Sequence, residues 1–208
     1  MLQFDINRIL LVLPGILLAI TFHEFAHGYV AYLLGDPTAK NSGRLTLNPI
    51  AHIDIVGFLM LIFAGFGWAK PVPVNPNYFK NRKLGMLYVS IAGPLTNILL
   101  AIILAITLGL VLQLQLSELA VRIIVNGIMI NLVLAIFNML PIPPLDGSKI
   151  LLSIVPEQWE YTVYKYEKYS YFILLALLFT GTISSILFPI VNYLFDLLLF
   201  FMQFIFGI

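Results

Sequence analysis

Two histidines and a glutamate lie within five residues near the start of the chain, in the motif His23-Glu24-Phe25-Ala26-His27. On an α-helix this spacing places both imidazoles on one face, about one turn apart. Two nitrogen ligands in this arrangement suit a zinc ion, and the neighbouring Glu24 suits a general base that accepts a proton from water. The motif therefore predicts a metal site capable of hydrolysis.

The motif lies inside an apolar stretch, residues 6–34, that is long enough to span a membrane as a helix. Ionisable side chains in a spanning helix are costly unless they are paired or coordinated. A buried histidine pair can be a simple polar contact between helices, but three ionisable residues within five positions favour a bound metal. We therefore expect one zinc ion per chain, held in part by His23 and His27.

Zinc in hydrolytic sites takes three protein ligands and leaves a fourth position to water, so another ligand must come from elsewhere in the chain. The candidates are His52, the remaining histidine, and Asp146, which follows three prolines in a segment that interrupts the predicted helices. Non-helical backbone at membrane depth is tolerated where it lines a cavity or is buried in protein. We therefore predict Asp146 as the third ligand. His52 is expected to be a structural loop residue, with a substrate-contacting or pH-sensitive role as the alternative.

The composition is that of a membrane protein. Of the 208 residues, 61% are hydrophobic and 10% are charged, whereas soluble domains have roughly 25% charged residues. The net charge of +1 gives no electrostatic footprint for nucleic acid. Three histidines are too few for the histidine-rich di-iron membrane oxygenases, and the lack of cysteine excludes disulfides and thiol chemistry. The expected surroundings are therefore the lipid bilayer, with no nucleic-acid partner.

Four long apolar blocks are expected to form membrane helices: residues 6–34, 84–112, 119–140 and a stretch from residue 171 onward. A fifth block, residues 53–66, is too short for a full crossing and is predicted to be re-entrant. The predicted fold class is an all-α polytopic membrane protein, a bundle of about 4–6 transmembrane helices forming one domain over the whole chain. From residue 171 onward the sequence allows either one kinked helix or a helical hairpin.

His27 and Asp146 share a depth in the membrane if blocks 6–34 and 119–140 run in the same direction, which requires block 53–66 to return to the side from which it enters. Basic residues support this topology, because Lys and Arg accumulate in cytoplasmic loops. It separates Arg8 and Arg122 from nine basic residues on the other side: Lys40, Arg44, Lys70, Lys80, Arg82, Lys83, Lys149, Lys165 and Lys168. We therefore expect an external N-terminus and a metal site toward the cytoplasmic side of the cell membrane.

Taken together, the motifs resemble the site-2 protease family of intramembrane zinc metalloproteases, in its small prokaryotic type without a PDZ or CBS domain. The resemblance rests on H-E-F-A-H at residues 23–27 and on N-x-x-P-x-P-x-L-D-G at residues 138–147, and it extends over most of the chain. Three further segments are similar to family elements: G-P-L-T-N at residues 93–97, G-R-L-T-L-N-P at residues 43–49 and W-A-K-P-V-P at residues 68–73.

Two positions depart from the family pattern. Ile55 follows Asp54 where the family commonly has a proline, and Ser148 stands where a second glycine is frequent. Neither residue is a predicted metal ligand.

The resemblance implies hydrolysis of peptide bonds within or near the membrane, in a transmembrane protein substrate. It implies Glu24 as the catalytic base and His23, His27 and Asp146 as the zinc ligands. This assignment agrees with the one reached from residue types and spacing.

Three asparagines lie on two of the predicted helices, and one of them, Asn97, is expected on the same side as the metal. Asn97, in G-P-L-T-N, is a candidate donor to substrate or to a developing oxyanion; a hydrogen bond between helices, helped by close packing at Gly93, is the alternative. Asn126 and Asn131 are assigned to hydrogen bonds between helices. Residues 45–47 (Leu-Thr-Leu) are expected to form a short β element, which with the re-entrant segment could pair with an unwound substrate.

The runner-up function is a catalytically silent membrane receptor or transporter that uses zinc as a structural or transported ion. Glu24 argues against a silent protein, and a closed structural zinc site would need more Cys and His than the chain has. Asp196, in the C-terminal apolar stretch, is a functional candidate by its position, with no partner evident in the sequence. Substrate identity, regulation and oligomeric state do not follow from the sequence.

Overall fold

The computed structural model describes residues 6–64 and 67–207, which are mostly helical. Its elements, in chain order, are α1 (Ile6–Leu33), α2 (Thr38–Asn41), η1 (Pro49–His52), α3 (Ile55–Ala64), η2 (Pro76–Tyr78), α4 (Arg82–Gln113), α5 (Glu118–Asn138), α6 (Asp146–Ile154), α7 (Glu157–Phe179) and α8 (Thr182–Phe206). Within the described residues there is no β-strand, and the prediction of an all-α protein is confirmed.

Four of the described helices are long and apolar enough to cross a membrane: α1 from Ile9, α4, α5 and α8. The apolar part of α7 is shorter, Lys168–Phe179. Many large apolar side chains on these helices face outward, among them Ile103 on α4 and Phe204 on α8. Such an exterior suits lipid, and the chain is a multi-pass membrane protein with spans at the lower end of the predicted number.

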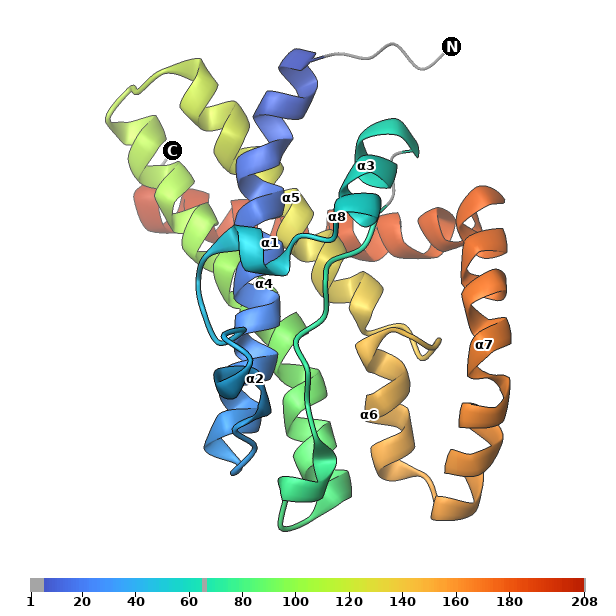
Figure 1. Cartoon of the computed structure of the whole chain (residues 1–208). Coiled ribbons are helices and arrows are strands. Elements are labelled where there is room, and N and C mark those ends of the chain that lie inside the picture. Colours follow the sequence, from blue (N-terminus) through green and yellow to red (C-terminus); the bar gives the residue numbers. More distant parts are fainter. Residues whose placement is uncertain (1–5, 65–66, 208) are drawn as a thin grey trace.

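Helices α1, α4 and α5 pack side by side, and α6 continues downward from the end of α5 (Figure 1). The same view shows α1 and α5 running in one direction and α4 in the opposite direction. The backbones of α1 and α5 come close where two glycines meet, because a Cβ built on Gly15 would lie 2.9 Å from the Cα of Gly127. The predicted parallel orientation of the first and third long blocks is therefore confirmed.

Helix α8 crosses behind α4 and α5 (Figure 1) and completes the apolar core. Most buried side chains of this core come from α4, α5 and α8, among them Leu108, Leu132 and Val191. Leu174 of α7 and Leu145 of the loop before α6 also belong to it. The chain between α7 and α8 turns at Gly181, whose φ of 74° is accessible to glycine at little cost. The C-terminal stretch thus forms two helices that meet at Gly181.

The short fifth block forms α3, whose 10 residues extend about 15 Å, half of a hydrocarbon core. The residues on either side of it meet: Ile53 pairs with Ala69 in an isolated antiparallel bridge, and the Lys70 N–H donates to the His52 carbonyl at 2.9 Å. The two ends of the segment therefore lie side by side, as predicted for a re-entrant element. Its residues 65–66 lie outside the described part of the chain.

The prediction of a β element at residues 45–47 is wrong. These residues form bends and irregular chain, and their polar groups are used locally instead of in a ladder. The carbonyl of Thr46 accepts a hydrogen bond from His52 Nε2 at 2.8 Å, and the Thr46 hydroxyl oxygen accepts one from the Asn48 N–H at 3.2 Å. A single strand needs a paired neighbour to be stable, and the structure gives this segment turn contacts in place of one.

Candidate metal centre

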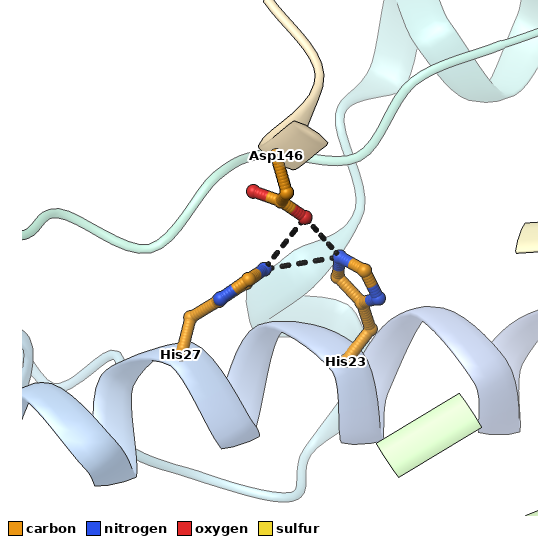
Figure 2. A group of neighbouring side chains, drawn as sticks. All are labelled: His23, His27 and Asp146. Carbon is orange, nitrogen blue, oxygen red and sulfur yellow. Dashed lines mark hydrogen bonds and ion pairs between the residues drawn. The ribbon is translucent and has the colours of Figure 1, made fainter. Parts of the chain in front are cut away.

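Three side chains from two distant parts of the sequence converge at one point (Figure 2). His23 and His27 project from successive turns of α1, and Asp146 reaches them from the first residue of α6. Asp146 Oδ2 lies 3.1 Å from the Nε2 atom of each histidine, and the two Nε2 atoms are 3.0 Å apart. All three side chains are buried.

The proline-rich loop after α5 brings Asp146 to this position. Helix α5 ends at Asn138, and α6 begins at Asp146 itself, where a carboxylate is favoured by the positive end of the helix dipole. Gly147 allows the turn, because a Cβ on it would lie 2.3 Å from the carbonyl oxygen of Met139. The Ser148 hydroxyl donates to the Leu145 carbonyl at 2.7 Å and closes the first turn.

Burial alone would raise the pKa of the Asp146 carboxyl group. When the facing imidazoles of His27 and His23 are protonated, they outweigh burial and hold this pKa below its ordinary value, so the carboxylate favours positive charge at the cluster. The other oxygen of the Asp146 carboxylate, Oδ1, lies 3.6 Å from the Nζ atom of Lys149. Asp146 thus offers an anionic oxygen to the two imidazoles.

The outer nitrogen of each imidazole faces an oxygen that can accept a hydrogen bond. His27 Nδ1 lies 2.7 Å from the carbonyl oxygen of Val89, and His23 Nδ1 lies 2.6 Å from Oδ1 of Asn97. Neither oxygen can donate a proton, so Nδ1 is the protonated nitrogen in both rings. In the neutral imidazoles the lone pairs therefore lie on the Nε2 atoms.

These hydrogen bonds determine which kind of ion the three side chains can bind. Two lone pairs and one carboxylate oxygen meet within 3.0–3.1 Å of one another, and such a group is repulsive unless positive charge lies between its members. Ligand atoms bound at about 2.0–2.1 Å from a tetrahedral zinc ion lie roughly 3.3 Å apart. The donor set and its spacing therefore fit a zinc ion with two nitrogen ligands and one oxygen ligand.

Gly93 of α4 packs directly against the two imidazole rings. A Cβ built on it would lie 2.5 Å from His27 Nε2 and 2.7 Å from His23 Nε2. Any larger residue would displace both nitrogens, so the glycine makes room for the cluster. This is the functional contribution of the G-P-L-T-N segment that residue types alone did not reveal.

Glu24 is buried beside the cluster, and a backbone group from a distant loop contacts it. The Val72 N–H donates to Glu24 Oε2 at 2.8 Å. Val72 stands between Pro71 and Pro73, so it supplies the single N–H of that tripeptide. The alternation of prolines is a sequence signal for an isolated backbone donor, although the sequence does not indicate that Glu24 is its partner.

The other candidate residues lie apart from the three-residue cluster. His52 is fully buried and donates to the Thr46 carbonyl through Nε2, in agreement with the prediction of a structural loop residue. Asp196 lies exposed on α8. The amide of Asn126 bonds to the Arg122 carbonyl within its own helix at 2.8 Å, so the prediction of a bond between helices is wrong there.

Asn97 has its side chain buried between helices, behind His23. Its Nδ2 donates to the Ala19 carbonyl of α1 at 3.0 Å and to Asn131 Oδ1 of α5 at 2.9 Å, while its Oδ1 faces His23. Of the two alternatives weighed from the sequence, this geometry is the hydrogen bond between helices. Both amide hydrogens are engaged, which leaves none for a developing oxyanion.

Comparison with known proteins gives the family. The model described as "Peptidase family M50" matches residues 111–181, which include the proline-rich loop and Asp146. YwhC of Bacillus subtilis (strain 168) is 42% identical over 183 residues, which cover 85% of this chain and 84% of that protein. Rip2 of Mycolicibacterium smegmatis is 29% identical over 197 residues, which cover 90% of this chain and 73% of that protein. Both relatives are named as candidate zinc metalloproteases.

No solved structure matches the chain. The similarity to YwhC nevertheless extends over most of both sequences and agrees with the matched family model. The chain therefore belongs to peptidase family M50, the site-2 protease family of membrane metalloendopeptidases.

Proposed function

We propose that this chain is a zinc-dependent intramembrane endopeptidase that hydrolyses peptide bonds in or near the transmembrane segments of membrane-protein substrates. The observation that carries the proposal is the meeting of two imidazole lone pairs and one carboxylate oxygen within 3.0–3.1 Å, one residue from a buried glutamate. His23, His27 and Asp146 would hold one zinc ion per chain. Zinc bound there supplies a Lewis acid for the scissile carbonyl and makes water a stronger acid.

Glu24 is assigned the role of general base. Its Oε2 accepts the Val72 N–H, so we assign proton transfer to Oε1, which would take a proton from the attacking water and pass it to the nitrogen of the leaving amine. Its place on α1 between two ligands keeps it next to the metal as long as the helix is intact. The Val72 contact limits the rotation of the carboxylate.

Burial of the cluster supports a reaction that takes place out of bulk water. His27 lies six residues before the end of α1, about 9 Å along the helix axis. The centre is thus nearer to the end of α1 that faces α2 and the basic loops than to the end that carries Arg8. By the distribution of Lys and Arg, we assign this nearer side to the cytoplasm.

The experiment is cleavage of a reconstituted substrate by Glu24→Gln. Purified full-length protein in lipid vesicles is mixed with a single-pass test protein whose transmembrane helix contains helix-destabilising residues, and fragments are measured with zinc content. We expect zinc content to stay the same and cleavage to be lost, because the base is removed and all three ligands remain. Glu118→Gln is the matched control, since Glu118 is exposed and paired with Arg122. Cleavage by Glu24→Gln at the wild-type rate would contradict the assigned base.

A further inference from the structure

A chain of buried amides links all three central helices to the first histidine. The Asn131 Nδ2 group donates to the Gly127 carbonyl within α5 at 2.8 Å, and Asn131 Oδ1 accepts from Asn97 Nδ2 of α4 at 2.9 Å. Asn97 Oδ1 in turn faces His23 Nδ1 of α1 at 2.6 Å. Both asparagine side chains are completely buried.

The Gly127 carbonyl fixes the direction of every hydrogen bond in this series of amides. The Gly127 carbonyl can only accept, so the Asn131 amide nitrogen must face it and the Asn131 oxygen must face Asn97. The Asn97 nitrogen must then face Asn131 and the Ala19 carbonyl, which leaves its oxygen for His23. The last link requires the proton of His23 to be on Nδ1.

We propose that Asn131 is a positioning residue for the metal centre, which acts through Asn97 to fix the tautomer of His23 and so directs the Nε2 lone pair at the metal. Asn131 contacts neither the histidine nor the carboxylate of the cluster. This role rests on the proposed function, because it gives His23 the ligand orientation that a metal centre needs. A partner on the second nitrogen of a metal-ligating histidine sets the ring orientation and tautomer.

The reverse orientation of the Asn97 amide shows why its hydrogen bond to Asn131 matters. If the Asn97 amide rotated by half a turn, its N–H group would face His23 Nδ1, and the proton of a neutral His23 would move to Nε2. A protonated Nε2 cannot bind a metal. In the native structure this rotation would place the Asn97 oxygen against two other oxygens, from Ala19 and Asn131. Removal of Asn131 takes away one of these two constraints.

His27 shows that the second histidine needs no such chain. Its Nδ1 faces the carbonyl oxygen of Val89 at 2.7 Å, and a backbone carbonyl has no second orientation. The amide chain is therefore specific to His23. A substitution at Asn131 should change the tautomer of His23 and leave that of His27 unaltered.

The test is Asn131→Leu in the full-length protein, in lipid nanodiscs, with two measurements. The first is zinc affinity by competition with a chelator. The second is the ¹⁵N spectrum of labelled histidines in the metal-free protein, where each tautomer has its own pair of nitrogen shifts. The chain has three histidines, so the signals are assigned with His52→Gln and His27→Gln.

We expect Asn131→Leu to bind zinc about 10- to 100-fold more weakly and to show an Nε2–H population for His23 that the wild type lacks. Asn131→Asp should restore most of the affinity and the Nδ1–H signal, because a carboxyl group buried between these helices is expected to stay neutral. Its O–H can donate to the Gly127 carbonyl and its other oxygen can accept from Asn97. Asn126→Leu is the matched control on the same helix, because the amide of Asn126 bonds within α5.

Unchanged zinc affinity and an unchanged His23 spectrum in Asn131→Leu would overturn the positioning role. Weaker zinc binding with a pure Nδ1–H signal would also overturn it, since it would show a packing effect and not a change of tautomer. A wild-type protein that binds no zinc would refute the proposed function instead, and the tautomer of His23 would still decide the role of Asn131.

Discussion

The backbone N–H of Val72 lies 2.8 Å from Oε2 of Glu24, although 48 residues separate them in the sequence. The residues around Val72 are held at several points. The Lys70 carbonyl accepts from Arg44 Nη2, and the Asn75 N–H donates to Asp36 Oδ2 at 2.7 Å. The segment that follows the re-entrant helix therefore reaches the glutamate in a fixed position.

This contact predicts that Val72→Pro slows cleavage, because proline has no N–H to donate. A hydrogen bond to a charged group contributes about 1.5–3 kcal/mol, which corresponds to roughly a 10- to 100-fold lower kcat. Zinc content should be unchanged. Val72→Ala keeps the N–H and is the control, with a kcat expected near that of the wild type. Equal kcat values for the proline and alanine variants would show that the N–H has no catalytic role.

Gly93→Ala should weaken metal binding. Its methyl group would lie 2.5–2.7 Å from the two ligand nitrogens, so His23 and His27 would have to move. We expect zinc affinity to fall by more than about tenfold, as for other changes that displace metal ligands. Ile103→Ala is the control on the same helix, because the Ile103 side chain faces outward, away from the cluster. If Gly93→Ala bound zinc as tightly as the wild type, the close contact between Gly93 and the imidazoles would not be needed for metal binding.

Asp146→Ala should reduce zinc stoichiometry from one per chain to near zero, because it removes the anionic ligand from a buried site. His52→Ala should retain zinc, since His52 bonds to the Thr46 carbonyl and lies outside the cluster. Metal analysis of the two purified variants decides between them. Retention of zinc by Asp146→Ala with its loss in His52→Ala would reverse the assignment of the third ligand.

Zinc should stabilise the folded protein against thermal unfolding. A ligand that binds the folded state alone adds about 2.7 kcal/mol at a free concentration of 100 times its Kd. The unfolding midpoint of the detergent-solubilised protein should therefore fall on chelation and recover when zinc is added back. The Asp146→Ala variant should not respond to either treatment. An equal response in this variant would place the stabilising metal elsewhere.

Much of the metal centre could be predicted from the sequence because its ligands are side chains of recognisable type. The four-residue spacing of His23 and His27 fixes their common helix face, and the prolines before Asp146 mark a break in the helices near the same depth. The requirement that His27 and Asp146 share a depth then gave the direction of the helices and the return of the re-entrant segment. Each of these steps depends on residue types, on their spacing and on the lengths of the apolar blocks.

The parts that could not be predicted depend on backbone groups and on tertiary partners. The Val72 N–H and the Val89 carbonyl carry no residue-type signal, so their contacts with Glu24 and His27 appear only in three dimensions. Residues 45–47 have side chains suited to a strand, but no neighbouring strand pairs with them. In the C-terminal stretch the helix breaks at Gly181 and continues through Pro189, since glycine allows a positive φ and membrane helices tolerate proline.

Zinc K-edge X-ray absorption on the purified full-length protein tests the metal centre most directly. The account predicts two imidazole ligands and oxygen ligands at about 2.0–2.2 Å, with one imidazole lost in His23→Ala and the spectrum unchanged in His52→Ala. A zinc site with no imidazole signal, or one that His52→Ala alters and His23→Ala does not, would contradict it.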